Sequence, residues 1–307
     1  YDLYSLADLK RTTEEGGNPL WGLSGPHDAG GYNDFPESTG FFRSEGGSWD
    51  SEYGHFFLDW YAQNLCDHGD RMLAAASRVF AADKVQLSVK LAGVHWWYKT
   101  RSHAAELTAG YYNTFGGRWS SVCHGYERLC ELCAKYNARM NFTCVEMRDS
   151  DLPQMALCSP EGLLMQVRHT AAKHRVHLSG ENALCRFDRD VYDRILECVV
   201  GTQHEDGTVI PPIFEFTFLR MFPEFFEHEN LKYFQQFARK MREVTLPWQF
   251  AGPEVAPQPP PEEGPPGKGP SKFAEFLEFD GDKDAKREGA EAEGDKDKEK
   301  GYMLFRF

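Results

Sequence analysis

The sequence lacks an apolar run long enough to cross a membrane, and it lacks a positive balance of charge. No apolar stretch approaches the ~18 residues that a membrane-spanning helix requires, so we expect no membrane partner. Asp and Glu number 47 against 34 Lys and Arg, which gives a net charge of −13. Because this balance repels phosphate backbones, we expect no nucleic-acid partner. The oligomeric state is left open.

Cysteine motifs with regular spacing are also scarce. The eight cysteines are scattered over 307 residues, which is typical of free buried thiols in a reducing compartment such as the cytoplasm or a plastid. Cys130 and Cys133 form one CxxC, but no second pair stands at zinc-ribbon spacing, and the surrounding segment has helical periodicity. We therefore expect a soluble protein without a metal site.

Residues 251–307 lack the apolar side chains that a packed core requires. The stretch AGPEVAPQPPPEEGPPGKGP (251–270) is rich in proline, and GDKDAKREGAEAEGDKDKEK (281–300) is charged. Neither buries enough apolar surface to offset its ordering entropy, so we predict a globular part over 1–250 and a Pro-rich, then charged, disordered tail over 251–307. Asp280, Asp282, Asp284 and Glu291 approach calcium-loop spacing, but Ala285 stands where that loop requires Gly, which favours a solvated charged run.

Within residues 1–250, short β-type runs alternate with longer runs of helical periodicity. We expect strands over 85–94, 138–147, 175–180 and 213–221, and helices over 52–81, 119–136, 160–173, 190–199 and 230–244. Nearly continuous apolar strands between helices predict a parallel sheet covered by helices, an α/β fold. Polar residues gather at the ends of the strands, where the sites of (β/α)₈ TIM barrels are built. Only four strand–helix units are visible, so the pattern indicates half of such a barrel.

Six motifs carry a family resemblance, and they follow one another in the family's order. They are PHDAGGYNDFPESTGFF (26–42), VKLAGVHWWYK (89–99), SHAAELTAGYYN (102–113), NFTCVEMRDS (141–150), GENALCRFD (180–188) and FTFLR (216–220). Through them, residues 1 to about 245 resemble the plant-type β-amylases, glycoside hydrolase family 14. The resemblance implies the last four β/α units of the barrel. It also implies inverting hydrolysis of α-1,4-glucosidic bonds of starch and maltodextrins from the non-reducing end, releasing maltose, with no cofactor.

The resemblance implies roles for individual residues. Glu181 of the GENAL motif is the catalytic general base, which activates a water against the anomeric carbon. Six residues are implied to contact substrate: Lys90, His95, Thr143, Asn182, Ala183 and Arg220. The residue types agree with these roles, since an ammonium such as that of Lys90 helps to hold a neighbouring carboxylate ionised, and a guanidinium presents a rigid fork of donors.

An inverting glycosidase needs a second carboxyl group, about 6.5–9.5 Å from the first. The family carries its general acid in a Gly-Glu-Leu-Arg-Tyr-Pro-type motif that this chain does not contain. We therefore expect the acid upstream of Tyr1, and we expect this chain alone to be inactive. Glu146 also follows a strand, but its neighbours favour a structural ion pair with a nearby Arg or Lys.

Several residues of these motifs have a second interpretation. Trp96 and Trp97 are core side chains or stacking surfaces for sugar rings. His103 and Glu106 resemble half of a metal motif, but a structural role is favoured. The whole chain also has an alternative, a non-catalytic starch- or maltodextrin-binding or regulatory homologue. The intact base and sugar-contacting residues argue against that alternative.

Overall fold

The computed structural model describes residues 2–83, 85–100, 103–108, 125–203, 209–213 and 215–245. The predicted tail over 251–307, the spacing from Asp280 to Glu291 and the predicted helical segment 119–124 lie outside the described residues. The α-helices are α1 (Leu3–Glu15), α2 (Glu52–Val79), α3 (Ala104–Thr108), α4 (Gly125–Lys135), α5 (Pro160–Lys173), α6 (Arg189–Val199) and α7 (His228–Thr245). The strands are β1 (Ser88–Leu91), β2 (Arg139–Phe142), β3 (Leu178–Glu181), β4 (Thr202–Gln203), β5 (Val209–Ile210) and β6 (Glu215–Thr217).

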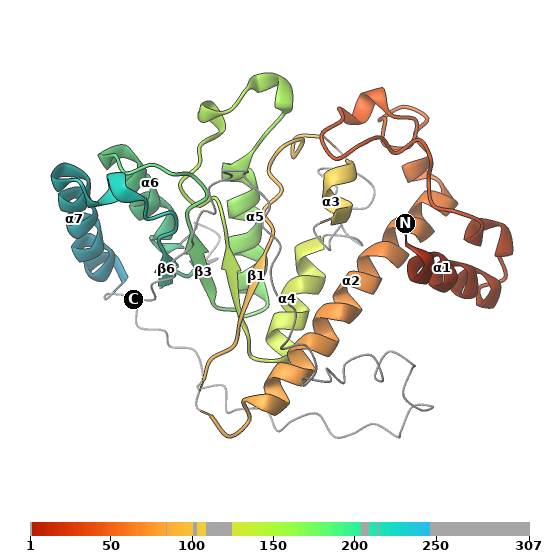
Figure 1. Ribbon diagram of the computed structural model, residues 1–307, viewed down its shortest axis with the longest axis horizontal. Helices are drawn as coiled ribbons and strands as arrows, with labels where there is room; N and C mark the ends of the chain where they lie inside the picture. Colours follow the sequence, from red (N-terminus) through yellow and green to blue (C-terminus); the bar gives the residue numbers. More distant parts are fainter. Residues whose placement is uncertain are drawn as a thin grey trace, which may run out of the picture. The chain divides into compact units, whose positions relative to one another are not determined.

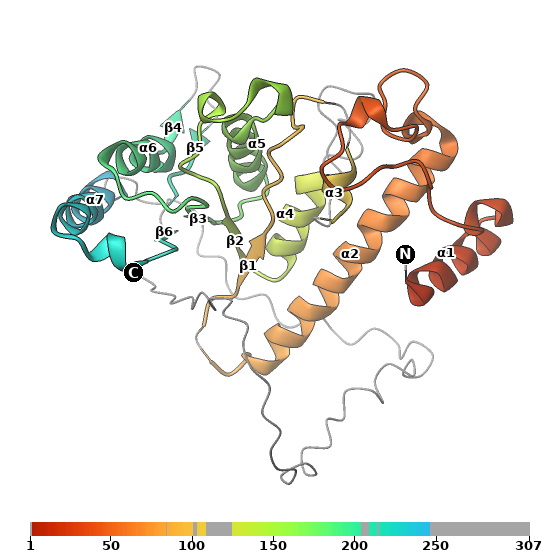
Figure 2. The ribbon, with the colours of Figure 1, turned by 45° about the horizontal axis from the view of Figure 1, so that its top comes forward.

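Strands β1, β2, β3 and β6 form a four-stranded parallel sheet in that order (Figure 1; all four strands are labelled in Figure 2). Helix α4 lies in the connection from β1 to β2, α5 in that from β2 to β3, and α6 in that from β3 to β6. The α/β class and the parallel sheet are thus confirmed. The antiparallel pair β4–β5 was not predicted, because strands of two residues are too short to show an alternation.

The two faces of the parallel sheet differ in chemistry. Side chains of one face join a hydrophobic core with helices α4 to α7, among them Val89, Met140, Phe142 and Phe216. The other face is polar, because alternate residues of each strand point to it. By strand register it carries Ser88, Lys90, Arg139, Asn141, Ser179, Glu181, Glu215 and Thr217. The expectation of nearly continuous apolar strands was therefore wrong, since the apolar runs extend beyond strands that are only three or four residues long.

The helices begin at residues that satisfy their free backbone amides. Ser159 caps α5 by accepting a hydrogen bond from Gly162 N, and Pro160 occupies its first turn. Asp188 caps α6 in the same way through Val191 N. Helix α5 has the bounds that the sequence predicts, and α7 begins two residues before its predicted start, at His228.

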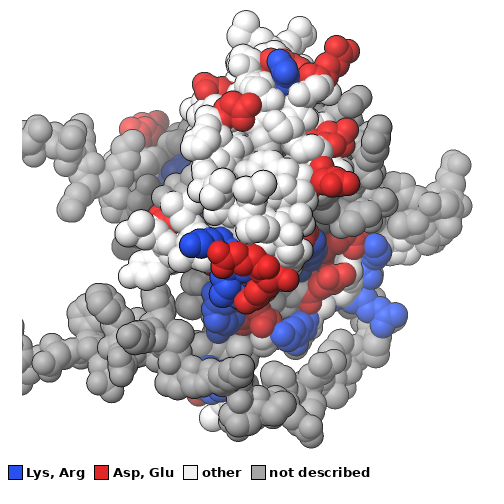
Figure 3. Space-filling model, turned by 90° about the vertical axis from the view of Figure 1, so that its right-hand side faces the viewer, with Lys and Arg blue, Asp and Glu red and all other residues white. Residues whose placement is uncertain are grey.

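Helices α1 and α2 enclose a second, smaller core of aromatic residues. Phe41, Trp49 and Phe57 are buried there together with Leu9 of α1. Helix α1 was not predicted, because only Leu9 and Thr13 of its residues are buried and its apolar periodicity is weak. Its solvent side carries ion pairs, and Figure 3 shows acidic and basic side chains interleaved on this face rather than gathered by sign.

None of the cysteines in the described part forms a disulfide. Cys130 and Cys133 lie inside α4, and burial raises the pKa of Cys133 to about 12, so its thiol stays protonated at neutral pH. Burial was predicted for all of them, and this was wrong for Cys185, which is exposed in the loop after β3, and for Cys66, which is half-buried. No helix of the described ranges is both long enough and apolar enough to cross a membrane.

Candidate active site

The carboxylate of Glu181 is held by one partner on each oxygen. Glu181 is the last residue of β3, and its side chain is only 3% exposed. Lys90 Nζ lies 2.8 Å from Oε1, and Asn141 Nδ2 donates a hydrogen bond of 2.9 Å to Oε2. A buried carboxylate is stable only when it is paired and hydrogen-bonded, and both conditions are met here. The orientation of the carboxylate is therefore fixed from two sides.

Strand register explains why these three residues meet. Lys90 of β1 is level with Asn141 of β2, and Asn141 is level with Ser179 of β3. Glu181 lies two residues beyond Ser179, so it projects from the same face of the sheet. The sequence predicted Lys90 and Glu181 but not Asn141. Two signals were available for Asn141: it is the first residue of the NFTCVEMRDS motif, and it is polar in the alternation Arg139-Met140-Asn141-Phe142.

The loop after Glu181 is joined to the loop after β6 by side-chain hydrogen bonds to backbone. Asn182 Oδ1 accepts from Leu219 N at 2.6 Å, and its Nδ2 contacts the carbonyl oxygens of Leu184 and Leu219. Arg220 Nε donates to Ala183 O at 2.6 Å. Asn182 is 1% exposed, so its amide is committed to these backbone partners. These hydrogen bonds fix the position of the loop that begins directly after Glu181.

Glu146 fixes the same loop from the other side. Its Oε1 accepts hydrogen bonds from Ala183 N at 2.8 Å and Leu184 N at 2.6 Å. The expected ion pair with a neighbouring Arg or Lys was wrong, because the side chain is turned inward, where it is 2% exposed, and meets backbone amides instead. Burial raises the pKa of Glu146, and its Oε2 has no hydrogen-bond partner among the described residues.

Three of the loops that follow the parallel strands contain a non-glycine residue with positive φ. Trp97 follows β1 with φ of 58°, Cys144 follows β2 with 56°, and Arg220 follows β6 with 64°. Such conformations are costly for residues with a side chain and tend to gather at functional sites. Two further residues of this kind, Asn137 and Arg175, precede β2 and β3 at the opposite edge, so positive φ is not confined to the edge that carries Glu181.

Thr143 lies in the loop after β2, close to the loop after β1. A Cβ atom on Gly93 would stand 3.1 Å from Thr143 Cγ2, so glycine permits the two loops to approach. The next residue but one, Val145, donates its backbone N–H to Glu181 O at 3.3 Å. The buried Cys144 between them is packed, and burial raises the pKa of its thiol. Thr143 is half-buried and is thus placed beside the end of β3.

His95 and the two tryptophans occupy the loop after β1. The carbonyl of His95 accepts from Ser159 N at 2.9 Å, which ties this loop to the start of α5. The ring of His95 meets Trp96 edge to face, and Tyr32 packs on Trp96. Burial lowers the pKa of His95, so the imidazole is neutral at pH 7. His103 lies 3.4 Å from Glu106, both deeply buried, as their expected structural role requires.

The structure thus brings the predicted residues together to different degrees. Lys90 and Glu181 are in contact, and Asn182, Ala183 and Arg220 join the loops that flank them. Thr143 is connected to the end of β3 through the backbone of its loop. No contact between His95 and the Glu181 carboxylate is found among the described side chains. A carboxylate held in this way can accept a proton from water at the carboxyl edge of a parallel sheet.

Known proteins match most of the chain. Residues 3–247 match the model of Glycosyl hydrolase family 14. Beta-amylase 1, chloroplastic, of Arabidopsis thaliana is 49% identical over 244 residues, which are 79% of this chain and 41% of that protein. Beta-amylase 2, chloroplastic, of Oryza sativa subsp. japonica is 47% identical over 244 residues, which are 79% of this chain and 42% of that protein. The chain therefore spans less than half the length of these curated relatives.

A solved structure shares the fold. The catalytic domain of beta-amylase from Paenibacillus polymyxa superposes with a TM-score of 0.55 at 23% sequence identity. The match covers 78% of this chain and 53% of that one. The parallel sheet and its covering helices are therefore an arrangement already known from solved proteins.

Proposed function

Since the chain belongs to glycosyl hydrolase family 14, we propose that it forms part of a β-amylase that hydrolyses α-1,4-glucosidic bonds of starch and maltodextrins from the non-reducing end. The observation that carries the proposal is the Glu181 carboxylate, which Lys90 and Asn141 hold at the end of β3. Relatives named as β-amylases support the reaction. The position of Glu181 at the carboxyl edge of the parallel sheet supports the location of the site.

The four parallel strands are proposed to be the last four of a (β/α)₈ barrel. Their order in the sheet follows their order in the chain, as it does in a barrel. Their polar face, with Lys90, Asn141 and Glu181, would then line the barrel interior, while the apolar face already meets helices α4 to α7. The other four units would correspond to the part of the relatives that the match does not cover.

In the proposed mechanism Glu181 is the general base. It takes a proton from a water that attacks the anomeric carbon from the side opposite the leaving sugar, which inverts the configuration. Lys90 and Asn141 keep both carboxylate oxygens oriented. A second carboxyl group, which we place in the remaining half of the barrel, protonates the departing oxygen. The products are maltose in the β-configuration and a shortened glucan.

The remaining predicted residues are proposed to shape the sugar site. Thr143 and His95 lie in the loops after β2 and β1, where they would meet substrate hydroxyls. The guanidinium of Arg220 retains N–H groups beyond the Nε that bonds Ala183 O, and these would serve the same purpose. Asn182 would act indirectly, because its three hydrogen bonds to backbone groups hold the loop after Glu181 in place.

A chimera tests this function. The segment of Arabidopsis beta-amylase 1 that precedes the matched region would be fused to this chain, and maltose release from maltoheptaose would be followed by NMR. We expect β-maltose as the first product from the chimera and no release from the 307-residue chain alone. Release of α-maltose would contradict the inverting mechanism. Oligosaccharide binding by a chimera without turnover would favour the non-catalytic alternative.

A plastid is the compartment that we propose for this protein. The relatives from Arabidopsis thaliana and Oryza sativa subsp. japonica are named chloroplastic, and the cysteines of the described part form no disulfide, as in a reducing compartment. A fluorescent fusion of the complete coding sequence, expressed in leaf cells, should accumulate in plastids. Cytosolic fluorescence would contradict the assignment.

A further inference from the structure

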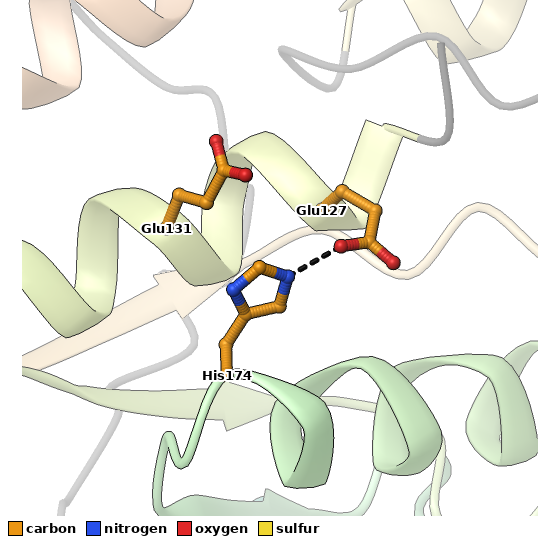
Figure 4. A group of neighbouring side chains, drawn as sticks. All are labelled: Glu127, Glu131 and His174. Atoms are coloured by element: carbon orange, nitrogen blue, oxygen red, sulfur yellow. Dashed lines mark hydrogen bonds and ion pairs between the residues drawn. The ribbon is translucent and has the colours of Figure 1, made fainter. Parts of the chain in front are cut away.

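Helices α4 and α5 bring together three donor groups that take no part in the Glu181 cluster. Glu127 and Glu131 stand one helical turn apart on α4, and His174 is the residue that ends α5. Figure 4 shows the imidazole of His174 reaching from the end of α5 towards α4, where it contacts Glu127. One donor atom from each of the three residues lies within 4.8 Å of the others.

The positions of the three side chains are set to different degrees. His174 N–H donates to Thr170 O, which fixes its backbone at the helix end, and its side chain is 17% exposed. Glu127 is held on one side by His174 and on the other by Lys173 Nζ, at 2.9 and 3.0 Å from its two oxygens. Glu131 is exposed, and no contact of its carboxylate is found among the described residues. Two donors are thus pre-positioned and the third is free to move.

Glu127 is also accessible from outside. A hollow of about 470 Å³ lies beside it, with Lys173, Gln166 and His169 in its wall, whereas Glu131 and His174 do not line this hollow. A hydrated cation that enters the hollow would therefore meet Glu127 first, and Lys173 has room to turn away from Glu127, since its side chain is 65% exposed.

We propose that Glu127, Glu131 and His174 form a binding site for a divalent transition metal of the zinc type. One imidazole and two carboxylates suit such a cation, whereas Mg²⁺ and Ca²⁺ favour oxygen ligands alone. In a tetrahedral zinc site neighbouring donors are roughly 3.3 Å apart, given metal–ligand distances of about 2.0–2.2 Å. The donor atoms now lie within 4.8 Å of one another, and rotation of the exposed Glu131 side chain would shorten its distances to the other two donors. The fourth position is open to water.

The bound metal would join α4 to the end of α5, from which the chain continues into β3. Two helices that cover the same face of the sheet would thereby be cross-linked at a point separate from Glu181. Because the unfolded chain does not hold these donors together, metal binding would stabilise the folded state. The ammonium of Lys173 competes for Glu127, so the metal-free arrangement is an ion-paired form of the same site.

Zinc titration of the full 307-residue chain tests this proposal. Isothermal titration calorimetry after chelator treatment should give one zinc site per chain that depends on the triad, and zinc should raise the melting temperature. Glu131→Gln removes a ligand without disturbing the pair of Glu127 and His174. It should lower zinc affinity at least about tenfold while leaving the zinc-free melting temperature unchanged. His174→Ala should lower the affinity as strongly.

Three controls separate a metal site from an ion-pair cluster. Lys173→Ala should raise zinc affinity several-fold, because the competing cation is gone. His228→Ala removes an exposed histidine that also neighbours a glutamate, Glu229, and should leave the affinity unchanged. Zinc affinity unchanged by Glu131→Gln, lowered by Lys173→Ala, or equalled by Mg²⁺ would overturn the proposal.

Discussion

Lys90 Nζ lies 2.8 Å from Glu181 Oε1, although the strands that carry these residues are not neighbours in the sheet. Strand β2 stands between them and contributes Asn141 to the other carboxylate oxygen. The ion pair therefore spans three strands on one polar face. Its geometry depends on the register of both strand pairs, and a change in either would separate the Glu181 carboxylate from the Lys90 ammonium.

Asn141 is expected to be required for turnover, even though the family motifs did not single it out. In the chimera, Asn141→Leu would leave Oε2 of a buried carboxylate without its donor, and we expect kcat to fall by about 10²-fold or more while KM changes less. Steady-state kinetics on maltoheptaose measure both. Ser179→Ala, which removes a hydroxyl near Asn141 Oδ1, is the matched control and should cost less than tenfold in kcat. Equal losses in the two variants would contradict the assignment.

Asn182 should contribute mainly to the stability of the site. Asn182→Ala leaves Leu219 N and two carbonyl groups without their buried partner, so we expect a loss of about 2 kcal/mol or more in the free energy of unfolding. Urea denaturation measures this loss. Asn230, which makes one exposed contact with Glu224 O, offers a control whose substitution by Ala should cost less than about 1 kcal/mol. A neutral Asn182→Ala would show that the loops are held by other contacts.

Glu146 should make stability depend on pH in a definite direction. Burial raises its pKa in the folded state above the ordinary value of 4.5, so the folded state binds the proton more tightly than the unfolded state does. Its contribution is complete below that ordinary value and is lost as pH rises through the folded pKa. Glu146→Gln keeps an oxygen for Ala183 N and Leu184 N but cannot ionise.

The stability of Glu146→Gln relative to the parent should therefore increase as pH rises above about 4.5, the ordinary value. Urea midpoints measured from pH 4 to 8 test this slope. Glu146→Ala is the contrasting variant, because it leaves two buried amides unpaired and should be destabilised by about 2 kcal/mol or more at every pH. If the difference in stability between Glu146→Gln and the parent stays constant over this pH range, the pKa of Glu146 does not differ between the folded and unfolded states.

Much of this fold was predictable from local sequence. Helix α5 begins at Pro160, after the capping residue Ser159, and ends at Lys173. Its start was predictable because the capping serine and the proline of the first turn are both strong local signals. The existence of the four parallel strands was also predictable, but their ends were not, since the apolar runs continue into the loops. Helix α1 was missed because only one turn of it packs against the second core.

The site was predictable only where a motif carried it. Glu181 and Lys90 were found through motifs. Asn141 also lies in a motif, but its contact with Glu181 follows from strand register, which the motif does not reveal. The role of Glu146 was misjudged because its partners, Ala183 N and Leu184 N, are backbone groups distant in sequence. Glu127 and His174 meet for the same kind of reason, through the packing of α4 on α5.

The measurement that tests the central claim most directly is the turnover of Glu181→Gln in the chimera. Gln accepts the hydrogen bond of Asn141 and fills the same volume, but it cannot take a proton from water. We expect kcat to fall by at least about 10³-fold with KM nearly unchanged, as loss of a general base requires. Near-normal turnover would contradict the assignment of Glu181 as the base.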